Sequence, residues 1–413
     1  MTPVSNQEIS EPAPITVGAQ PSAVFTGGSD RPEVVKVRIG FMPLSDCASV
    51  VMASLLGFDR KYGIRIIPVR ESSWAAVRDK LVSGNLDMAQ ALYGLIYGVH
   101  MGISGRQKDM AVLMTLNRNG QGLTLSRNLA YQGITTLERL ERQIRCDRRR
   151  YTFAQTFPTG THAMWQCCWL ASAGINPFSD VDAMTVAPPQ MVSHMQRGHV
   201  DGFSVGEPWN QRAIVEDVGI SVASSQDIWP DHPEKVLGST ADFMERHPNA
   251  ARAAIMAVLE ASRWIDASIA NKTQMAEAIA KPAFVNSPLD QILPRMLGQY
   301  RDGLGRIWHD PRHVKFFDDG AVNFPYLSDG MWFLTQYKRW GLLRTHPDYL
   351  GVAERINRID LYRDAAAALG VQVPNSPLRS SCLLDGGEWN GADPAAYADH
   401  FDVRAPAPRL EAA

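Results

Sequence analysis

The stretch Arg70–Gln90, RESSWAAVRDKLVSGNLDMAQ, decides the fold, because it reads as a strand end, a helix, a tight turn and a further strand. Ser72 or Ser73 is placed to cap the helix, and Trp74 follows at its first position. Gly84 is placed to end the helix in a left-handed conformation. The apolar residues of the helix recur three and four positions apart, which predicts a helix packed on a sheet: Ala76, Val77, Leu81 and Val82.

The start of this predicted helix suits a small anion. A helix N-terminus carries about half a positive charge and free N–H groups. Trp74 adds a flat aromatic wall beside that end. The functional interpretation is one side of an anion pocket, and the alternative is a core Trp that packs the helix start.

A second copy of the pattern occurs more than 100 residues later. Pro189–Pro208, PQMVSHMQRGHVDGFSVGEP, again reads as a short helix, a Gly-x-x-Asp turn and a strand. The repeat predicts two similar α/β lobes with a ligand in the crevice between them. Strands expected at 34–41, 64–69 and 86–90 give the first lobe a βαβαβ plan with parallel pairing.

The order of these segments predicts the domain organisation of the 413 residues. Residues 1–33 are expected to form a disordered leader, since they are polar and broken by Pro and Gly. Residues 34–123 and 239–350 are expected to form the first lobe, and residues 124–238 the second. Residues 351–413 are expected to hold a C-terminal helix and a tail.

The charge balance argues against direct nucleic-acid or membrane binding. The chain has 41 basic and 43 acidic side chains and a formal net charge of −2. Residues 1–31 show neither an apolar run of signal-peptide length nor a twin-arginine start, which predicts a cytoplasmic protein. The five cysteines suit neither a disulfide framework nor a zinc site, and free thiols in a reducing compartment are expected.

Four further candidate site residues lie where strands or helices are expected to begin or end. Gln121 lies between two glycines, and His162 starts the helix that Thr161 is expected to cap. Gly206 allows close approach of a backbone, and Lys235 lies where the chain is expected to return to the first lobe. Gln121, His162 and Lys235 each have a structural alternative: a turn Gln in solvent, a satisfied surface or core His and a solvated loop Lys.

Several motifs in this order resemble the nitrate- and bicarbonate-binding proteins of the NrtA/CmpA type. The resemblance covers about residues 34–370 and is carried by VRIGFMPLSD, SSWAAVRDKLVSGNLDMAQ, LNRNGQGLTLS, FPTGTHAMW, VGEPWN and HPEKVLG. It implies an α/β, two-lobed, periplasmic-binding-protein-like fold of type II with a central ligand cleft. It implies a binding protein rather than an enzyme.

The resemblance also implies a nitrate site. By motif, the nitrate contacts of the family fall on Trp74, Gln121, His162, Gly206 and Lys235. Bicarbonate-binding relatives carry an acidic residue at the Lys235 position and use calcium, so Lys235 favours nitrate or nitrite without a metal or another cofactor. The ammonium of Lys235 would neutralise a planar monovalent anion directly.

The start of the sequence points to one branch of this family, the cytosolic nitrate sensors of the NasS type. The resemblance then implies an ANTAR-domain RNA-binding antiterminator of the NasT type as the partner, held inactive until nitrate releases it. Two alternatives stay open: a binding protein of an ABC transporter, and an enzyme of small acids or aminopyrimidines on the same fold.

Overall fold

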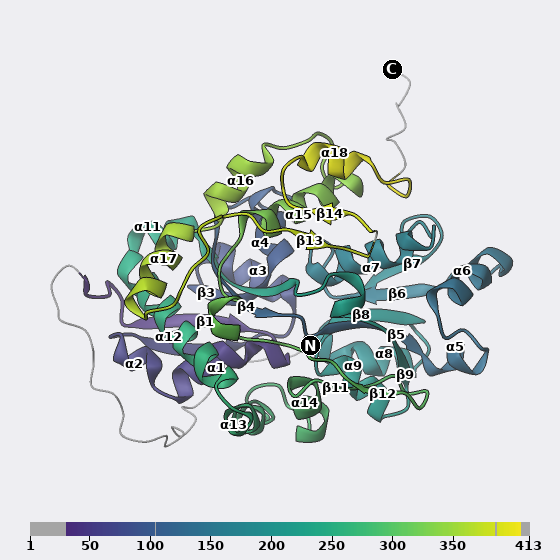
Figure 1. Cartoon of the computed structure of the whole chain (residues 1–413), viewed down its shortest axis with the longest axis horizontal. Coiled ribbons are helices and arrows are strands. Elements are labelled where there is room, and N and C mark those ends of the chain that lie inside the picture. The colour runs from purple at the N-terminus through teal and green to yellow at the C-terminus, as the bar shows by residue number, and fades with distance from the viewer. Residues whose placement is uncertain (1–29, 104, 385, 406–413) are drawn as a thin grey trace, which may run out of the picture.

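The computed structural model describes residues 30–103, 105–384 and 386–405, and the expected leader lies mostly outside them. Two five-stranded sheets stand beside each other, and helices cover both (Figure 1). This confirms the prediction of a two-lobed α/β fold. We call the part built on the first sheet lobe I and the part built on the second sheet lobe II.

Lobe I is built on the strand order β2-β1-β3-β10-β4. Strand β1 pairs in parallel with β2 and β3, whereas β10 runs antiparallel between β3 and β4. The strands span β1 (Lys36–Phe41), β2 (Arg65–Arg70), β3 (Met88–Leu92), β4 (Met110–Arg118) and β10 (Pro233–Thr240).

Lobe II repeats this plan in the order β7-β6-β8-β5-β9. Strand β6 pairs in parallel with β7 and β8, and β5 runs antiparallel between β8 and β9. In both lobes the fourth strand position is therefore filled by a strand that arrives from the other lobe. The strands span β5 (Gln121–Ser126), β6 (Thr152–Gln155), β7 (Asp182–Thr185), β8 (Gly202–Gly206) and β9 (Gly219–Ser224).

The two crossover strands correct the expected placement of two site residues. Gln121 was expected in the first lobe but begins β5 of lobe II, and Lys235 was expected on the lobe II side but lies on β10 of lobe I. The reason is that each crossover strand pairs with the sheet it enters, a contact that local sequence does not encode. The chain changes sheet between 118 and 121 and between 228 and 233; the domain limits at 123 and 238 stay a prediction.

Helices pack on both lobes, and the long α12 lies against α1 and α17 in the core of lobe I. Lobe II carries α5 (Arg127–Tyr131), α6 (Leu137–Cys146), α7 (Thr161–Ser172), η3 (Pro188–Gln190), α8 (Met191–Gln196), α9 (Trp209–Val215) and α10 (Ser225–Ile228). The helices that precede lobe II in sequence are η2 (Ser45–Cys47), α1 (Ala48–Leu55), α2 (Phe58–Lys61), α3 (Trp74–Ser83) and α4 (Tyr93–His100). The helices that follow lobe II are α11 (Ala241–Arg246), α12 (Pro248–Asp266), α13 (Ile269–Ile279), α14 (Leu289–Met296), η4 (Asp318–Gly320), α15 (Leu327–Arg339), α16 (Tyr349–Ile356), α17 (Ile359–Ala368) and α18 (Pro394–Asp399).

Helices α15, α16 and α18 lie at the top of the molecule in Figure 1, and the short hairpin of β13 (Ser381–Cys382) with β14 (Glu388–Trp389) lies beside them. A second short hairpin, formed by β11 (Gln299–Arg301) with β12 (Ile307–His309), precedes α15 in sequence and lies near α14 at the bottom of the same view. Among the described residues, every helix is too short or too polar to cross a membrane.

Two helices near the site, α3 in lobe I and α7 in lobe II, were predicted to begin at capping side chains. The prediction holds for α3 but not for α7. The Ser73 side chain accepts a hydrogen bond from Ala76 N and caps α3, and Gly84 ends the helix at φ 76°. These findings confirm the prediction for α3. In α7, Gly160 is the cap and Thr161 is already helical, so the prediction of a Thr161 cap was wrong. His162 nevertheless lies in the first turn, as expected.

Candidate anion-binding site

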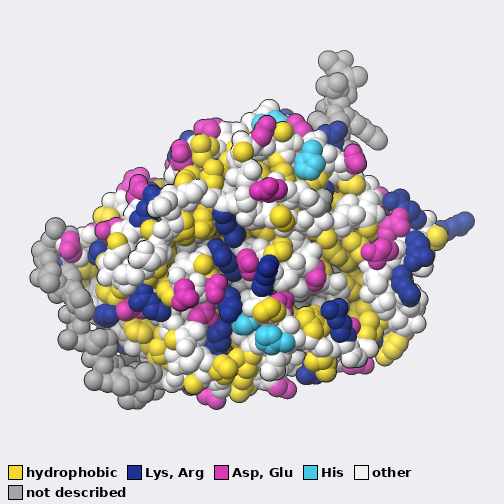
Figure 2. Space-filling view, viewed as in Figure 1, with side chains coloured by type: hydrophobic (Ala, Val, Ile, Leu, Met, Phe, Trp, Pro, Cys, Tyr) yellow, Lys and Arg dark blue, Asp and Glu magenta, His cyan; other side chains and the backbone are white. Residues whose placement is uncertain are grey.

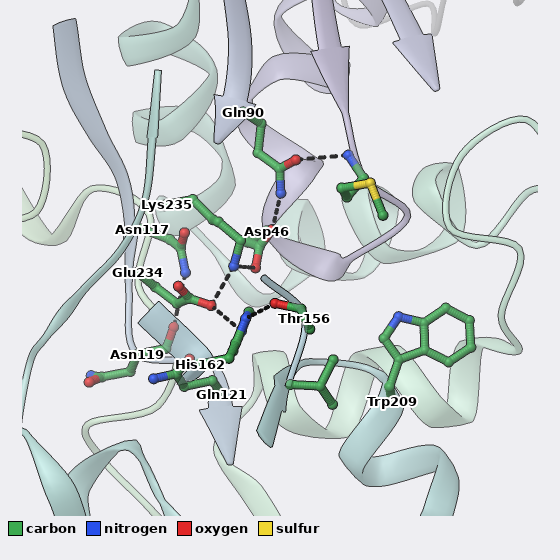
Figure 3. Close-up of polar contacts among 12 residues, drawn as sticks. Asp46, Gln90, Asn117, Asn119, Gln121, Thr156, His162, Trp209, Glu234 and Lys235 are labelled. Atoms are coloured by element: carbon green, nitrogen blue, oxygen red, sulfur yellow. Dashed lines mark hydrogen bonds and ion pairs between the residues drawn. The ribbon is translucent and has the colours of Figure 1, made fainter. Parts of the chain in front are cut away.

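The five predicted site residues meet where the two lobes touch. Trp74 and Lys235 come from lobe I, and Gln121, His162 and Gly206 from lobe II. All are buried, with relative exposures of 0% for Lys235 and His162, 1% for Trp74 and 3% for Gln121, and Gly206 in a fully buried strand. Figure 3 shows Gln121, His162, Glu234 and Lys235 gathered around one small volume.

Trp74 and Lys235 lie close together although 161 positions separate them in sequence. The Lys235 ammonium lies 5.7 Å from the centre of the Trp74 indole ring, within the range of a cation–π contact. The indole Nε1 is buried and has no hydrogen-bond partner among the described residues. A buried N–H without a partner is costly, so this donor is available to a ligand.

Lys235 is held between two carboxylates. Its Nζ lies 3.0 Å from Asp46 Oδ2 and also contacts Glu234 Oε1. Burial opposes the charge, but these two neighbours raise the pKa of Lys235 above its ordinary value. Burial raises the pKa of Asp46 to about 6, whereas Lys235 and His162 outweigh burial at Glu234 and lower its pKa. The ionised state near neutral pH is therefore one cation between two anions.

His162 connects the lobes. Its Nδ1 lies 2.7 Å from Thr156 Oγ1, and its Nε2 lies 3.0 Å from Glu234 Oε1. Burial lowers the pKa of His162 despite the nearby carboxylate, which favours the neutral imidazole near pH 7. Nδ1 is therefore hydrogen-bonded, whereas Nε2 lies within ion-pair distance of Glu234 but has no hydrogen-bond partner among the described residues. A ligand would reach His162 at Nε2, on the side of Glu234 (Figure 3).

Gln121 and Gly206 form the lobe II side of the site. They are paired in register on the neighbouring strands β5 and β8. Both polar atoms of the Gln121 side chain are buried and lack partners among the described residues. A Cβ built on Gly206 would lie 3.3 Å from Asp46 Oδ2 and 3.6 Å from Glu234 Oε1, so a side chain here would fill the space between this backbone and the two carboxylates.

The lobes are closed over the site. Ser45 N donates to Glu207 O at 2.8 Å, and Trp209 Nε1 donates to Pro43 O at 3.0 Å, both across the lobe boundary. The Tyr337 hydroxyl on α15 contacts Gly94 O in lobe I at 2.5 Å and Thr159 O in lobe II at 2.9 Å. Because the site residues are fully buried, a ligand can enter only after the lobes separate.

Four buried polar residues in or beside the site were not among the predicted site residues. Asp46, His232, Glu234 and Glu207 are 3%, 0%, 0% and 4% exposed. Glu207 Oε1 lies 3.2 Å from Nε of the buried Arg295. For His232 and Glu234 the signal is DHPEK, which runs directly into the apolar strand residues VLG and so places charges at a buried strand end.

His232 makes folding sensitive to acid. Its ring lies 4.2 Å from the Trp165 ring, centre to centre, and burial lowers its pKa to about 3. The unfolded chain binds this proton near pH 6.5 and the folded chain does not, so stability falls as the pH drops below 6.5. Between pH 7 and 5 we expect a loss of about 2 kcal/mol from this residue.

Urea unfolding of the wild type and of His232→Asn at both pH values measures this contribution. The variant should lose less stability than the wild type on acidification by about that amount. Equal losses in the two proteins would contradict the assignment. The difference reports His232 together with its electrostatic link to Glu234 and His162.

The donor groups of the site suit a small oxyanion. Among the described residues no group of three His, Cys, Asp or Glu side chains is placed to hold a metal ion. Basic and acidic side chains are interspersed on the face shown in Figure 2, without a wide region of one sign. The N–H groups of Trp74 and Gln121 and the ammonium of Lys235 are the donors that a small oxyanion requires.

Comparisons with a family model and with known proteins point to the same family. Residues 30–280 match the model of the NMT1-like family. The chain is 35% identical over 390 residues to the nitrate/nitrite binding protein NrtA of Synechocystis sp. (strain ATCC 27184 / PCC 6803 / Kazusa), covering 91% of this chain and 87% of NrtA. It is 32% identical over 390 residues to the nitrate import ATP-binding protein NrtC of the same organism, covering 94% of this chain and 58% of NrtC.

A solved structure agrees with this result. The crystal structure of the periplasmic nitrate-binding protein NrtA from Synechocystis PCC 6803 superposes with a TM-score of 0.86 at 34% identity. The match covers 90% of this chain and 100% of that chain.

Proposed function

The chain belongs to the NMT1-like family of NrtA/CmpA-type anion-binding proteins, and from this premise we propose that it is a solute-binding protein for nitrate, with nitrite as a second ligand. One observation carries the proposal. Trp74, Gln121, His162, Gly206 and Lys235, predicted from five separate motifs, come together in one buried volume between the lobes. The protein acts as a binding protein rather than an enzyme, and it needs no cofactor.

The chemistry of the site favours a planar monovalent anion. The Lys235 ammonium supplies a charge-assisted hydrogen bond, and Trp74 Nε1 and Gln121 Nε2 supply neutral donors. Sulfate and phosphate bring a second charge that would be buried beside Asp46 and Glu234, at a high cost in desolvation. Lys235 also disfavours a bicarbonate site that uses calcium, since a divalent cation would be repelled by the ammonium.

The ligand couples the two lobes. It contacts residues of both, so it binds the closed arrangement more tightly than an open one and shifts the population toward closure. Moving that population from 1:99 to 99:1 requires a preference of roughly 5.5 kcal/mol. The segments 118–121 and 228–233, where the chain changes sheet, are the places for the hinge.

Isothermal titration calorimetry tests the proposed ligand. We expect saturable 1:1 binding of nitrate and nitrite, and no binding of sulfate or phosphate. Bicarbonate should not bind, with or without calcium. Absence of heat with nitrate, confirmed by equilibrium dialysis with labelled nitrate, would exclude the proposed function.

The biological role that the relatives favour is transport. NrtC is described as a nitrate import ATP-binding protein and is similar to nearly the whole of this chain. We therefore propose that this protein delivers nitrate to an ABC transporter. The sensor that holds an ANTAR-type antiterminator in the cytoplasm is the second proposal, and it rests only on the composition of residues 1–31.

Cell fractionation and co-purification separate these two roles. Recovery outside the cytoplasm together with transporter subunits supports transport. Recovery in the cytoplasm with an RNA-binding partner that nitrate releases supports the sensor and excludes the transport role.

A further inference from the structure

The carboxylate of Glu234 lies at the centre of the proposed anion site. Its Oε1 contacts Lys235 Nζ and lies 3.0 Å from His162 Nε2. A Cβ built on Gly206 would lie 3.6 Å from the same oxygen. One carboxylate oxygen thus contacts Lys235 and His162, two of the five residues that we propose to bind nitrate (Figure 3).

A carboxylate and a nitrate ion compete for the same partners. Both are planar, carry one negative charge and accept hydrogen bonds through oxygens on a trigonal centre. Lys235 and Glu234 are both 0% exposed, so water does not screen the repulsion between Glu234 and an added anion. Nitrate and the Glu234 carboxylate therefore do not share the contacts with Lys235 and His162.

A second buried group can receive the displaced carboxylate. His232 is two residues before Glu234 and 0% exposed, and both of its ring nitrogens lack hydrogen-bond partners among the described residues. Glu234 Oε2 lacks one as well. Glu234 and His232 are close enough for each to act on the pKa of the other, so a turn of the Glu234 side chain would bring its carboxylate to the His232 imidazole.

We propose, building on the proposed nitrate function, that Glu234 is a tethered anion that occupies the nitrate position in the free protein and that nitrate binds by displacing it toward His232. The tether keeps this competitor at a high effective concentration. Glu234 thus sets the minimum strength with which a free anion must bind Lys235 and His162. An anion that binds these two residues less well than a carboxylate cannot displace Glu234.

Calorimetry of Glu234→Gln tests the proposal. The amide keeps the shape of the side chain but removes its charge, so nitrate affinity should rise by about tenfold or more. Asp46→Asn is the matched variant, because Asp46 also contacts Lys235 and is also buried. It leaves Glu234 in place as the remaining partner of Lys235, so its affinity should rise clearly less than that of Glu234→Gln.

The nitrate affinities of the two variants distinguish displacement of Glu234 from other roles of its carboxylate. Equal tightening in both variants would overturn the proposal, because it would show that only the removed charge counts. Unchanged or weaker binding by Glu234→Gln would also overturn it and would assign Glu234 a supporting role for His162. Neither result affects the nitrate function, which fails only if the wild type does not bind nitrate.

Crystal structures of the wild-type protein without and with nitrate give a second test that does not depend on the variants folding. The proposal expects nitrate at Lys235 and His162, and a Glu234 carboxylate oxygen within hydrogen-bond distance of His232. A Glu234 side chain that keeps both of its contacts in the nitrate complex would overturn it.

Discussion

Lys235→Glu is expected to abolish nitrate binding. The substitution replaces the buried ammonium by a third carboxylate beside Asp46 and Glu234, within contact distance of the Trp74 ring. Removing one partner of a buried charge pair costs several kcal/mol, so an affinity loss of at least about 1,000-fold, or ~4 kcal/mol, is expected. Calorimetry with nitrate measures the loss.

Two further variants make this result specific. Lys235→Gln removes the charge without adding a carboxylate and should weaken binding less. Lys36→Glu changes the net charge of the protein equally, but Lys36 is exposed at the start of β1, at the opposite end of that strand from Asp46. It should bind nitrate as the wild type does. Wild-type affinity in Lys235→Glu, with the fold confirmed by circular dichroism, would contradict the site.

Gly94→Ala should prevent the lobes from closing. A Cβ built on Gly94 in α4 would overlap the carbonyl oxygen of Thr159 in lobe II. A backbone carbonyl cannot move aside as a side-chain end can, so the closed arrangement loses population whereas the site residues remain unchanged. Since apparent affinity falls with the closed fraction, a loss of about 100-fold is expected.

Gly98→Ala is the graded control for this experiment. Its Cβ would overlap side-chain atoms of Thr159 and no backbone atom within the three nearest contacts, so the loss should be smaller than for Gly94→Ala. Small-angle X-ray scattering should show that nitrate compacts the wild type but not Gly94→Ala. Full nitrate affinity in Gly94→Ala would show that the contact between α4 and Thr159 is not needed for binding.

The repeated local pattern made the two lobes predictable. Ser73 as cap, Gly84 as the left-handed end of the helix, and the Gly-x-x-Asp turns at 84–87 and 198–201 are local features, and local sequence encodes them. The antiparallel strands β5 and β10 were not predictable in the same way. Their pairing depends on strands more than 80 residues away in sequence, and this is why Gln121 and Lys235 were placed on the wrong sides.

The identity of the five site residues followed from the motifs, whereas their electrostatic setting did not. Asp46 and Glu234 read as ordinary polar residues, since a carboxylate next to a Lys is usually solvated. Only the closed lobes show that both are buried against Lys235. Burial of this kind is a property of tertiary packing, and no local pattern in the sequence reports it.

A crystal structure of the protein grown with nitrate tests the central claim most directly. The account predicts one planar anion between the lobes, in contact with Lys235, His162, Gln121, the Trp74 indole and the Gly206 backbone. A nitrate ion bound elsewhere, or an interlobe site that stays without the anion at saturating nitrate, would contradict it.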